Sequence, residues 1–150
     1  MRTMMKEIRA EVEIKGSSEQ VWRGLTQFEK YPEWNPFIRK ISGELLDGAK
    51  LDVTISTFIG MNMDFKLTVD SILQNRGMRW LGQTLMPGLL DGKHYFEIKQ
   101  LEGGKVQFVQ YEQFSGLLLP VSWVFVSRSA KRNFESMNLG LKEWVESGKV

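Results

Sequence analysis

The sequence predicts an α+β fold in which an antiparallel sheet of six to seven strands packs around one long C-terminal helix. Three observations support this prediction. Between residues 38 and 115, short segments alternate apolar with polar side chains, as half-buried strands do. Turn residues such as Asp47-Gly48 and Gly103-Gly104 join several of these segments and favour hairpins. After Pro120 the apolar residues change to helical spacing and keep it over roughly 25 residues.

The first element that we expect is a strand, because apolar and polar residues alternate over residues 8–14. A turn and a short helix follow this strand. Ser17 and Ser18 are candidate N-caps for the helix, and Glu19 or Gln20 can complete the cap. The start of the chain is therefore expected to run in the order strand, turn, helix.

The segment Tyr31-Pro32-Glu33-Trp34-Asn35-Pro36-Phe37 separates this helix from the later strands. Its two prolines fix φ at their own positions and push the residue before each toward extended geometry. We therefore expect a kinked connector whose aromatic side chains are buried, rather than a continuing helix or strand. Two roles are open for Trp34: a plug of this corner against the sheet, which we favour, or a contact with a ligand.

The later strands are expected at residues 38–45, 50–57, 63–74, 78–84, 93–101 and 105–115. Their short connections predict an antiparallel meander. The weakest connection is at residues 86–90, within the apolar segment 85–90. Four roles are open for it: a lid over a cavity, a contact with a membrane, a contact with another subunit, or a segment folded back onto the core.

The C-terminal helix is predicted from apolar residues spaced three and four apart: Val126, Ala130, Phe134, Met137, Leu141 and Val145. The other faces of this helix are expected to carry Ser127, Lys131, Glu135, Asn138 and Lys142. A helix of this amphipathic kind buries its apolar face against the sheet and leaves the remaining faces to solvent.

Two parts of the sequence resemble the START-related helix-grip superfamily, also called SRPBCC or polyketide cyclase/dehydrase-like. The opening, from Ile14-Lys15-Gly16-Ser17-Ser18 to the Trp34-Asn35-Pro36 corner, resembles the start of that fold. Glu112-Gln113-Phe114-Ser115-Gly116 is similar to an E-x-F-x-G pattern that ends a strand in this family. The resemblance implies a single domain over residues 1–150, in which a curved sheet grips the C-terminal helix and two short helices lie between strands 1 and 2. It also implies a cavity for an apolar small molecule, such as a lipid, an isoprenoid or a polyketide-like compound.

If a cavity lies between the sheet and the C-terminal helix, large and soft side chains from both should line it. The apolar candidates are Trp34, Met61, Met63, Phe65, Trp80, Phe96, Phe108, Phe114, Phe134, Met137 and Leu141. Taken alone, these residues favour a filled core, as most alternating apolar positions do. The family resemblance favours a cavity.

His94, Gln110 and Glu112 are the polar candidates for the cavity wall, because each alternates onto the strand face that carries most of the aromatic residues. A slip of one residue at the Gly103-Gly104 turn would reverse this placement. His94 and Glu112 are also the candidate catalytic pair, since an imidazole and a carboxylate can transfer a proton near neutral pH. We favour a structural role, in which the two groups bond to each other or to water at the rim.

Composition argues against several classes of function. A formal net charge of +2 with scattered charges argues against nucleic acid and against a strongly anionic membrane as partners. The absence of cysteine excludes disulfides and thiolate sites, and the single histidine excludes a site with several imidazoles, so we expect no metal and no cofactor. The apolar run at 117–126 is far shorter than the roughly 20 residues that span a bilayer, and charged residues interrupt the N-terminal segment. We therefore expect a cytoplasmic protein.

Three functions remain open at this point. The leading one is the binding of an apolar or amphipathic small molecule in the cavity, for which transient contact with a membrane is allowed. The second is a cyclase- or dehydratase-like enzyme in which His94 and Glu112 move protons. The third is a module that docks onto a larger protein assembly, which a completely filled core would favour. The sequence does not indicate the oligomeric state.

Overall fold

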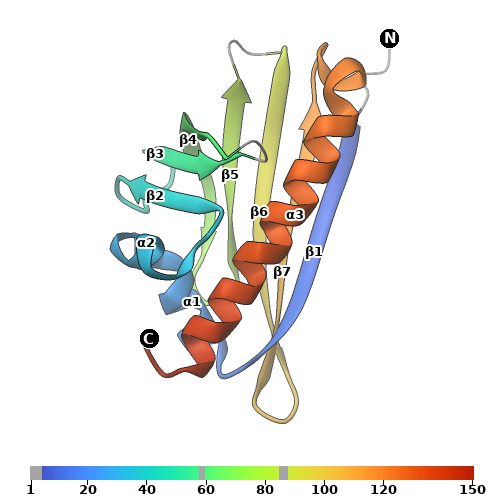
Figure 1. Cartoon of the computed structure of the whole chain (residues 1–150). Helices are drawn as coiled ribbons and strands as arrows, with labels where there is room; N and C mark the ends of the chain where they lie inside the picture. Colours follow the sequence, from blue (N-terminus) through green and yellow to red (C-terminus); the bar gives the residue numbers. More distant parts are fainter. Residues whose placement is uncertain (1–4, 58–59, 85–87) are drawn as a thin grey trace.

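The computed structural model describes residues 5–57, 60–84 and 88–150 of the chain. Figure 1 shows one long helix lying across one face of a curved sheet, with the short helices near its C-terminal end. The elements in chain order are β1 (Met5–Lys15), α1 (Ser18–Thr26), the short 3-10 helix η1 (Phe28–Lys30), α2 (Tyr31–Trp34), β2 (Ile38–Ser42), β3 (Lys50–Ser56), β4 (Asn62–Leu73), β5 (Gly77–Thr84), β6 (Leu90–Leu101), β7 (Lys105–Ser115) and α3 (Leu119–Glu146).

The strands form one seven-stranded antiparallel sheet in the order β1-β7-β6-β5-β4-β3-β2. β2 to β7 follow one another as the predicted meander, and β1 pairs with the outer edge of β7. β2 ends at Ser42, earlier than predicted, because Gly43 adopts a φ of +121° that interrupts the extended backbone. β6 begins at Leu90, also earlier than predicted. The α+β helix-grip architecture expected from the sequence is confirmed.

β6 and β7 pair without a one-residue slip at the Gly103-Gly104 turn. His94 is the partner of Glu112, and Phe96 is the partner of Gln110. His94, Phe96 and Gln110 are all buried, so this register turns them toward the interior of the fold. The structure therefore places these three side chains on the inner face of the sheet.

The connection from β1 to β2 begins with a well-capped helix. Ser17 is the N-cap of α1, and its backbone N–H donates to the Gln20 side chain at 2.9 Å while Gln20 N–H donates back to the Ser17 hydroxyl at 3.2 Å. The following corner is more regular than expected, because its first four residues form the one-turn helix α2. Pro32 fits there since the first turn of a helix needs no backbone donor. Asn35 then closes the corner: its Oδ1 accepts from the N–H groups of Phe37 at 3.0 Å and Ile38 at 2.8 Å.

The long helix α3 spans 28 residues and packs mainly against β1. Phe134, Met137 and Leu141 are buried, as the helical spacing predicts. The expectation that Asn138 lies on a polar, solvent-facing side is wrong: this residue is only 2% exposed. Its side chain meets Gln110 of β7 beneath the helix. None of the described helices is both long and apolar enough to cross a membrane.

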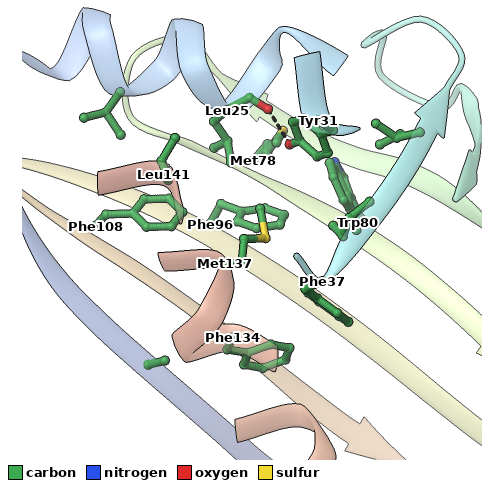
Figure 2. Packing of buried hydrophobic residues seen from close by; sticks show 14 of the residues in the cluster. Leu25, Tyr31, Phe37, Met78, Trp80, Phe96, Phe108, Phe134, Met137 and Leu141 are labelled. Carbon is green, nitrogen blue, oxygen red and sulfur yellow. Dashed lines mark hydrogen bonds between the residues drawn. The ribbon is translucent and has the colours of Figure 1, made fainter. Parts of the chain in front are cut away.

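Large side chains fill the space between α3 and the middle of the sheet. Met137, Leu141, Phe96 and Phe108 belong to one buried cluster (Figure 2), in which the rings of Phe96 and Phe108 stack with 6.2 Å between their centroids. Phe37, from the corner, approaches Phe134 of α3 with 5.8 Å between the ring centroids. The core is therefore densely packed where α3 covers the sheet, and any open space must lie on the part of the sheet that α3 does not cover.

Candidate functional site

A pocket of about 180 Å³ opens on the inner face of the sheet, beside the packed core. Strands β2 to β7 all contribute to its wall, whereas no described residue of α3 does so. The lining residues are Phe37, Ile38, Val53, Ile55, Phe65, Leu67, Trp80, Gly82, Gln83, Leu90, Asp91, Gly92, His94, Glu112 and Phe114. Most of them are apolar, and the polar ones all come from the neighbouring strands β5, β6 and β7.

The volume of the pocket limits what it can hold. A cavity of roughly 150 Å³ accepts benzene, whereas drug-sized ligands need roughly 300 Å³ or more. A pocket of about 180 Å³ therefore has room for one ring with short substituents, or for one end of a longer molecule. Exposed Gln83 and half-buried Asp91 belong to its wall, so the pocket communicates with solvent at this point.

Two glycines keep part of the pocket open. Gly82 and Gly92 are cross-strand partners in β5 and β6, and both belong to the wall. A Cβ at position 82 would come within 2.9 Å of Leu67 Cδ2, and a Cβ at position 92 would collide with Glu112 Oε1. The absence of a side chain at Gly92 therefore makes the space in which the Glu112 carboxyl group lies.

His94 and Glu112 are partners across β6 and β7 and form a polar part of the wall. His94 Nδ1 lies 3.5 Å from Glu112 Oε2. The side chains of His94 and Glu112 are 9% and 20% exposed, so both are largely withdrawn from bulk water. A separation of 3.5 Å is suitable for an ion pair but long for a strong hydrogen bond. The structure thus brings together the two residues that the sequence suggested as a pair.

A buried chain of hydrogen bonds continues from His94 to α3. His94 Nε2 lies 3.0 Å from Gln110 Oε1. Gln110 Nε2 donates to the backbone carbonyl oxygen of Phe134 at 3.1 Å and to Asn138 Oδ1 at 2.6 Å. Gln110 is fully buried, so these bonds satisfy an amide that would otherwise be costly to bury. The chain connects the wall of the pocket to the helix that covers the sheet.

Aromatic rings hold the imidazole of His94 in its plane. Its ring centroid lies 4.5 Å from that of Phe96, 4.8 Å from that of Phe134 and 6.4 Å from that of Trp80. These packed rings restrict tilting of the imidazole. Its two polar neighbours then set which ring atoms face them, because Nε2 meets Gln110 Oε1 and Nδ1 meets Glu112 Oε2.

The predicted cavity residues separate into four groups. Those around the pocket are Phe65, Trp80, His94, Glu112 and Phe114. Those in the packed core or its buried polar chain are Phe96, Phe108, Gln110, Phe134, Met137 and Leu141. Trp34 is 8% exposed and its ring centroid lies 5.0 Å from that of Tyr31, in the corner before β2. Met61 and Met63 are 62% and 46% exposed and do not reach the wall, because they lie before β4 and at its first residues.

Several residues of the site were not anticipated from the sequence. Phe37 and Ile38 reach the pocket only because the Asn35 turn directs the chain there. Gly92 could have been recognised from the sequence, since a glycine inside an alternating strand often marks a place where another group approaches the backbone closely. Asn138 could have been inferred indirectly, because an inward-facing Gln110 needs a buried hydrogen-bond partner and α3 is the element opposite.

Only part of the apolar segment 85–90 can be placed, because residues 85–87 lie outside the described residues. The carbonyl oxygens of Gly88 and Leu89 accept hydrogen bonds from the N–H groups of Leu117 at 3.0 Å and Leu118 at 2.9 Å. Leu90 lines the pocket. This part of the segment therefore joins the start of α3 to the pocket wall, and a lid remains a prediction.

Within the described parts of the chain, no three His, Asp or Glu side chains lie close enough together to hold a metal ion. The side chains of the pocket wall can offer apolar contact, hydrogen bonding and proton transfer at His94 and Glu112.

Residues 5–146 match the sequence model of a protein family described as polyketide cyclase/dehydrase and lipid transport. This match covers nearly the whole chain. No curated protein is similar enough in sequence to count as a match.

Solved structures share the fold over nearly their full length. The Zhui aromatase/cyclase from Streptomyces sp. R1128 has a TM-score of 0.81 at 13% identity, over 98% of this chain and 97% of its own. A START superfamily protein from Mycobacterium smegmatis has a TM-score of 0.74 at 22% identity, over 94% and 97% of the two chains. Norcoclaurine synthase from Thalictrum flavum has a TM-score of 0.78 at 13% identity, over 100% and 99%. At these identities the similarity shows the fold alone.

Proposed function

The chain belongs to the polyketide cyclase/dehydrase and lipid transport family, and on that basis we propose that it binds a small apolar or amphipathic molecule in the pocket on the inner face of its sheet. The occupant is one ring, or one end of a lipid, isoprenoid or polyketide-like chain, because the pocket measures about 180 Å³. The rest of a longer ligand would extend past Gln83 and Asp91 toward solvent.

The pocket itself is the observation that carries this proposal. The neighbouring core is densely packed, yet the space beside Trp80 and Phe114 stays open. The glycine pair of β5 and β6 helps to keep it open, since a Cβ on either glycine would press on the surrounding side chains. An apolar wall with a few placed polar groups is the usual composition of a small-molecule site.

Binding can be tested by titrating 1,4-dimethylbenzene into the protein and following backbone amide and methyl shifts by NMR. Ile55→Phe places a larger side chain in the pocket wall, while Ile72→Phe makes the same change at a half-buried position outside it. We expect the wild type and Ile72→Phe to bind alike, and Ile55→Phe to bind at least about tenfold more weakly. Equal binding by the two variants, or no binding by the wild type, would contradict the proposal.

A second candidate function is acid–base catalysis on the bound molecule. Its support is the 3.5 Å approach of His94 Nδ1 to Glu112 Oε2 in the pocket wall, where a proton could pass to or from a carbonyl or hydroxyl group of the ligand. His94→Ala and Glu112→Gln test it: a turnover that survives both changes would exclude these residues as the catalytic pair.

A cytoplasmic location is part of the same proposal. A chain without cysteine suits a reducing compartment, because it needs no disulfide for stability. Fractionation of the source cells followed by detection of the protein tests this. Its recovery in the cytosolic fraction is the expected result, and its recovery in another compartment would contradict it.

A further inference from the structure

We propose that the pocket selects ligands that carry a hydrogen-bond donor, a hydroxyl or an amino group, because Glu112 Oε1 is a free acceptor in its wall. This inference rests on the proposed function and names the chemical class of ligand for the same pocket. It follows from the buried hydrogen bonds, which determine how each polar atom of the His94–Glu112 pair is used.

The first step is the orientation of the Gln110 amide. A backbone carbonyl oxygen can only accept, so the Gln110 atom beside the carbonyl of Phe134 must be the nitrogen. The opposite Gln110 atom, which faces His94 Nε2 at 3.0 Å, is therefore the oxygen. An amide oxygen can only accept, so His94 Nε2 carries a hydrogen atom and donates it. Gln110 is thus a positioning residue that determines the tautomer of His94.

The second step concerns the other nitrogen of His94. In the neutral ring with a hydrogen on Nε2, Nδ1 bears a lone pair and faces Glu112 Oε2 at 3.5 Å. A proton shared across this contact would lie between the two lone pairs. That proton lies either on Nδ1, opposite a carboxylate, or on Oε2 of a neutral carboxyl group.

In both cases Glu112 Oε1 carries no hydrogen and remains an acceptor. No described residue donates a hydrogen bond to this atom, and the Glu112 side chain keeps 20% of its surface exposed. Oε1 lies over Gly92, which belongs to the pocket wall. A ligand group that donates a hydrogen bond would satisfy Oε1, whereas a ketone, aldehyde or carboxylate would set a second acceptor against it.

The charges around the pocket agree with this selectivity. The described wall contains the carboxyl groups of Asp91 and Glu112 and no lysine or arginine. Asp91 already accepts hydrogen bonds from the N–H of Gly88, at 3.2 and 3.1 Å to its two oxygens. The one group of this described wall that can carry a positive charge is His94, and its Nδ1 already faces Glu112. An anionic ligand would therefore find no unpaired cation there, and a neutral or protonated donor group is the better partner.

The tautomer can be tested without any ligand. His94 is the only histidine of the chain, so long-range 1H–15N correlation spectra of the imidazole contain one unambiguous set of signals. The expected result is a protonated Nε2, with Nδ1 either protonated or carrying a hydrogen-bonded lone pair. A neutral ring with its hydrogen on Nδ1 and none on Nε2 would overturn the inference.

The selectivity is tested with four ring-sized probes. 4-Methylphenol and 4-methylaniline carry donors, 4-methylbenzaldehyde carries only an acceptor, and 1,4-dimethylbenzene carries neither. We expect the two donor probes to bind at least about tenfold more tightly than the aldehyde. Equal affinities for all four would overturn the donor selectivity and leave the proposed function intact. Failure of all four to bind would overturn both.

Two substitutions of Glu112 provide the matched control. Glu112→Gln keeps the preference, because its amide N–H can donate to Nδ1 while its oxygen takes the place of Oε1. Glu112→Met has a similar length and no comparable acceptor, so the preference for the phenol and the aniline should fall to less than about twofold. Binding of 1,4-dimethylbenzene by Glu112→Met shows that the pocket persists. A donor preference that survives in Glu112→Met would overturn the assignment to Oε1.

Discussion

The backbone carbonyl group of Trp34 lies directly against Gly140 of α3, closer than a Cβ at position 140 would permit. The ring of Pro36 lies beside the same glycine, 3.3 Å from where that Cβ would be. This contact joins the α2 corner to the long helix, and the same corner supplies Phe37 and Ile38 to the pocket wall. The shape of the pocket therefore depends on a glycine outside it.

Gly140→Ala should destabilise the protein by about 1–3 kcal/mol, because the new methyl group forces the corner away from α3. In an exposed helix, replacing glycine by alanine would stabilise the helix by about 1 kcal/mol. The sign of the change in unfolding free energy therefore shows whether position 140 is in close contact with the corner. The free energy of unfolding in urea provides the measurement. Leu139→Ala, at the exposed neighbouring position, serves as the control and should have a small effect. A gain in stability for Gly140→Ala would show that the corner and the helix are not in contact.

Asn138→Ala should lower the free energy of unfolding by about 1–3 kcal/mol. The substitution removes the acceptor of the 2.6 Å bond from Gln110 Nε2 and leaves a buried N–H without that partner. Asn133→Ala, a half-buried change on the same helix, should cost less. Thermal and urea unfolding of the two variants give the comparison. Equal losses of unfolding free energy in both variants would contradict a stabilising role for the buried chain of hydrogen bonds.

Gly92→Ala should weaken the preference for donor-bearing probes more than it weakens the binding of 1,4-dimethylbenzene. The added Cβ would collide with Glu112 Oε1 and push the carboxyl group out of its place. Gly82→Ala is the matched control, because its Cβ would press at 2.9 Å on the flexible end of the Leu67 side chain and does not reach Glu112. NMR titrations with 4-methylphenol and 1,4-dimethylbenzene measure both effects. An unchanged preference in Gly92→Ala would place the acceptor elsewhere.

The stability of the protein should fall as the pH rises above about 10. Burial raises the pKa of Tyr31 far above its usual value, and its hydroxyl donates to the carbonyl oxygen of Leu25 (Figure 2). The unfolded chain ionises this phenol at a pKa of about 10 and so releases a proton that the folded protein retains. The free energy of unfolding is therefore independent of this group below pH about 10 and decreases above it.

Tyr31→Phe tests this pH dependence. The variant lacks the ionisable phenol group, so its free energy of unfolding should decline less steeply than that of the wild type between pH 10 and 11. At pH 8 the variant should be less stable by about 1 kcal/mol, because the hydrogen bond to Leu25 is lost. Parallel curves for the two proteins in urea unfolding would show that Tyr31 does not contribute.

The fold could be predicted from the sequence wherever local and tertiary preferences coincide. Apolar alternation in β6 and β7 identified the inner face because strands of an antiparallel sheet bury one side. Gly103 and Gly104 identified the turn between them, and both have positive φ, at +77° and +71°. A cap at the start of α1 was also expected, because the bonds that define it lie within one turn, and the structure selects Ser17 and Gln20 from the two candidates for each position.

The site was harder to predict, because a pocket is the space that the packed side chains do not fill. Phe96 fills the core while Phe65 lines the pocket, although both alternate onto the inner face of a strand. The difference depends on where α3 covers the sheet, which no local pattern records. Asn138 was misplaced for a related reason: the helical spacing placed it away from the apolar face, whereas Gln110, distant in sequence, donates a hydrogen bond to its buried side-chain oxygen.

The most direct test of the proposed function is the location of a bound probe. Intermolecular NOEs between 4-methylphenol and the side chains of Trp80 and Phe114 would report occupancy of the pocket itself. The proposal predicts such NOEs in the wild type and in Ile72→Phe, and their loss in Ile55→Phe. NOEs confined to residues outside the pocket, or NOEs to Trp80 and Phe114 that persist unchanged in Ile55→Phe, would contradict it.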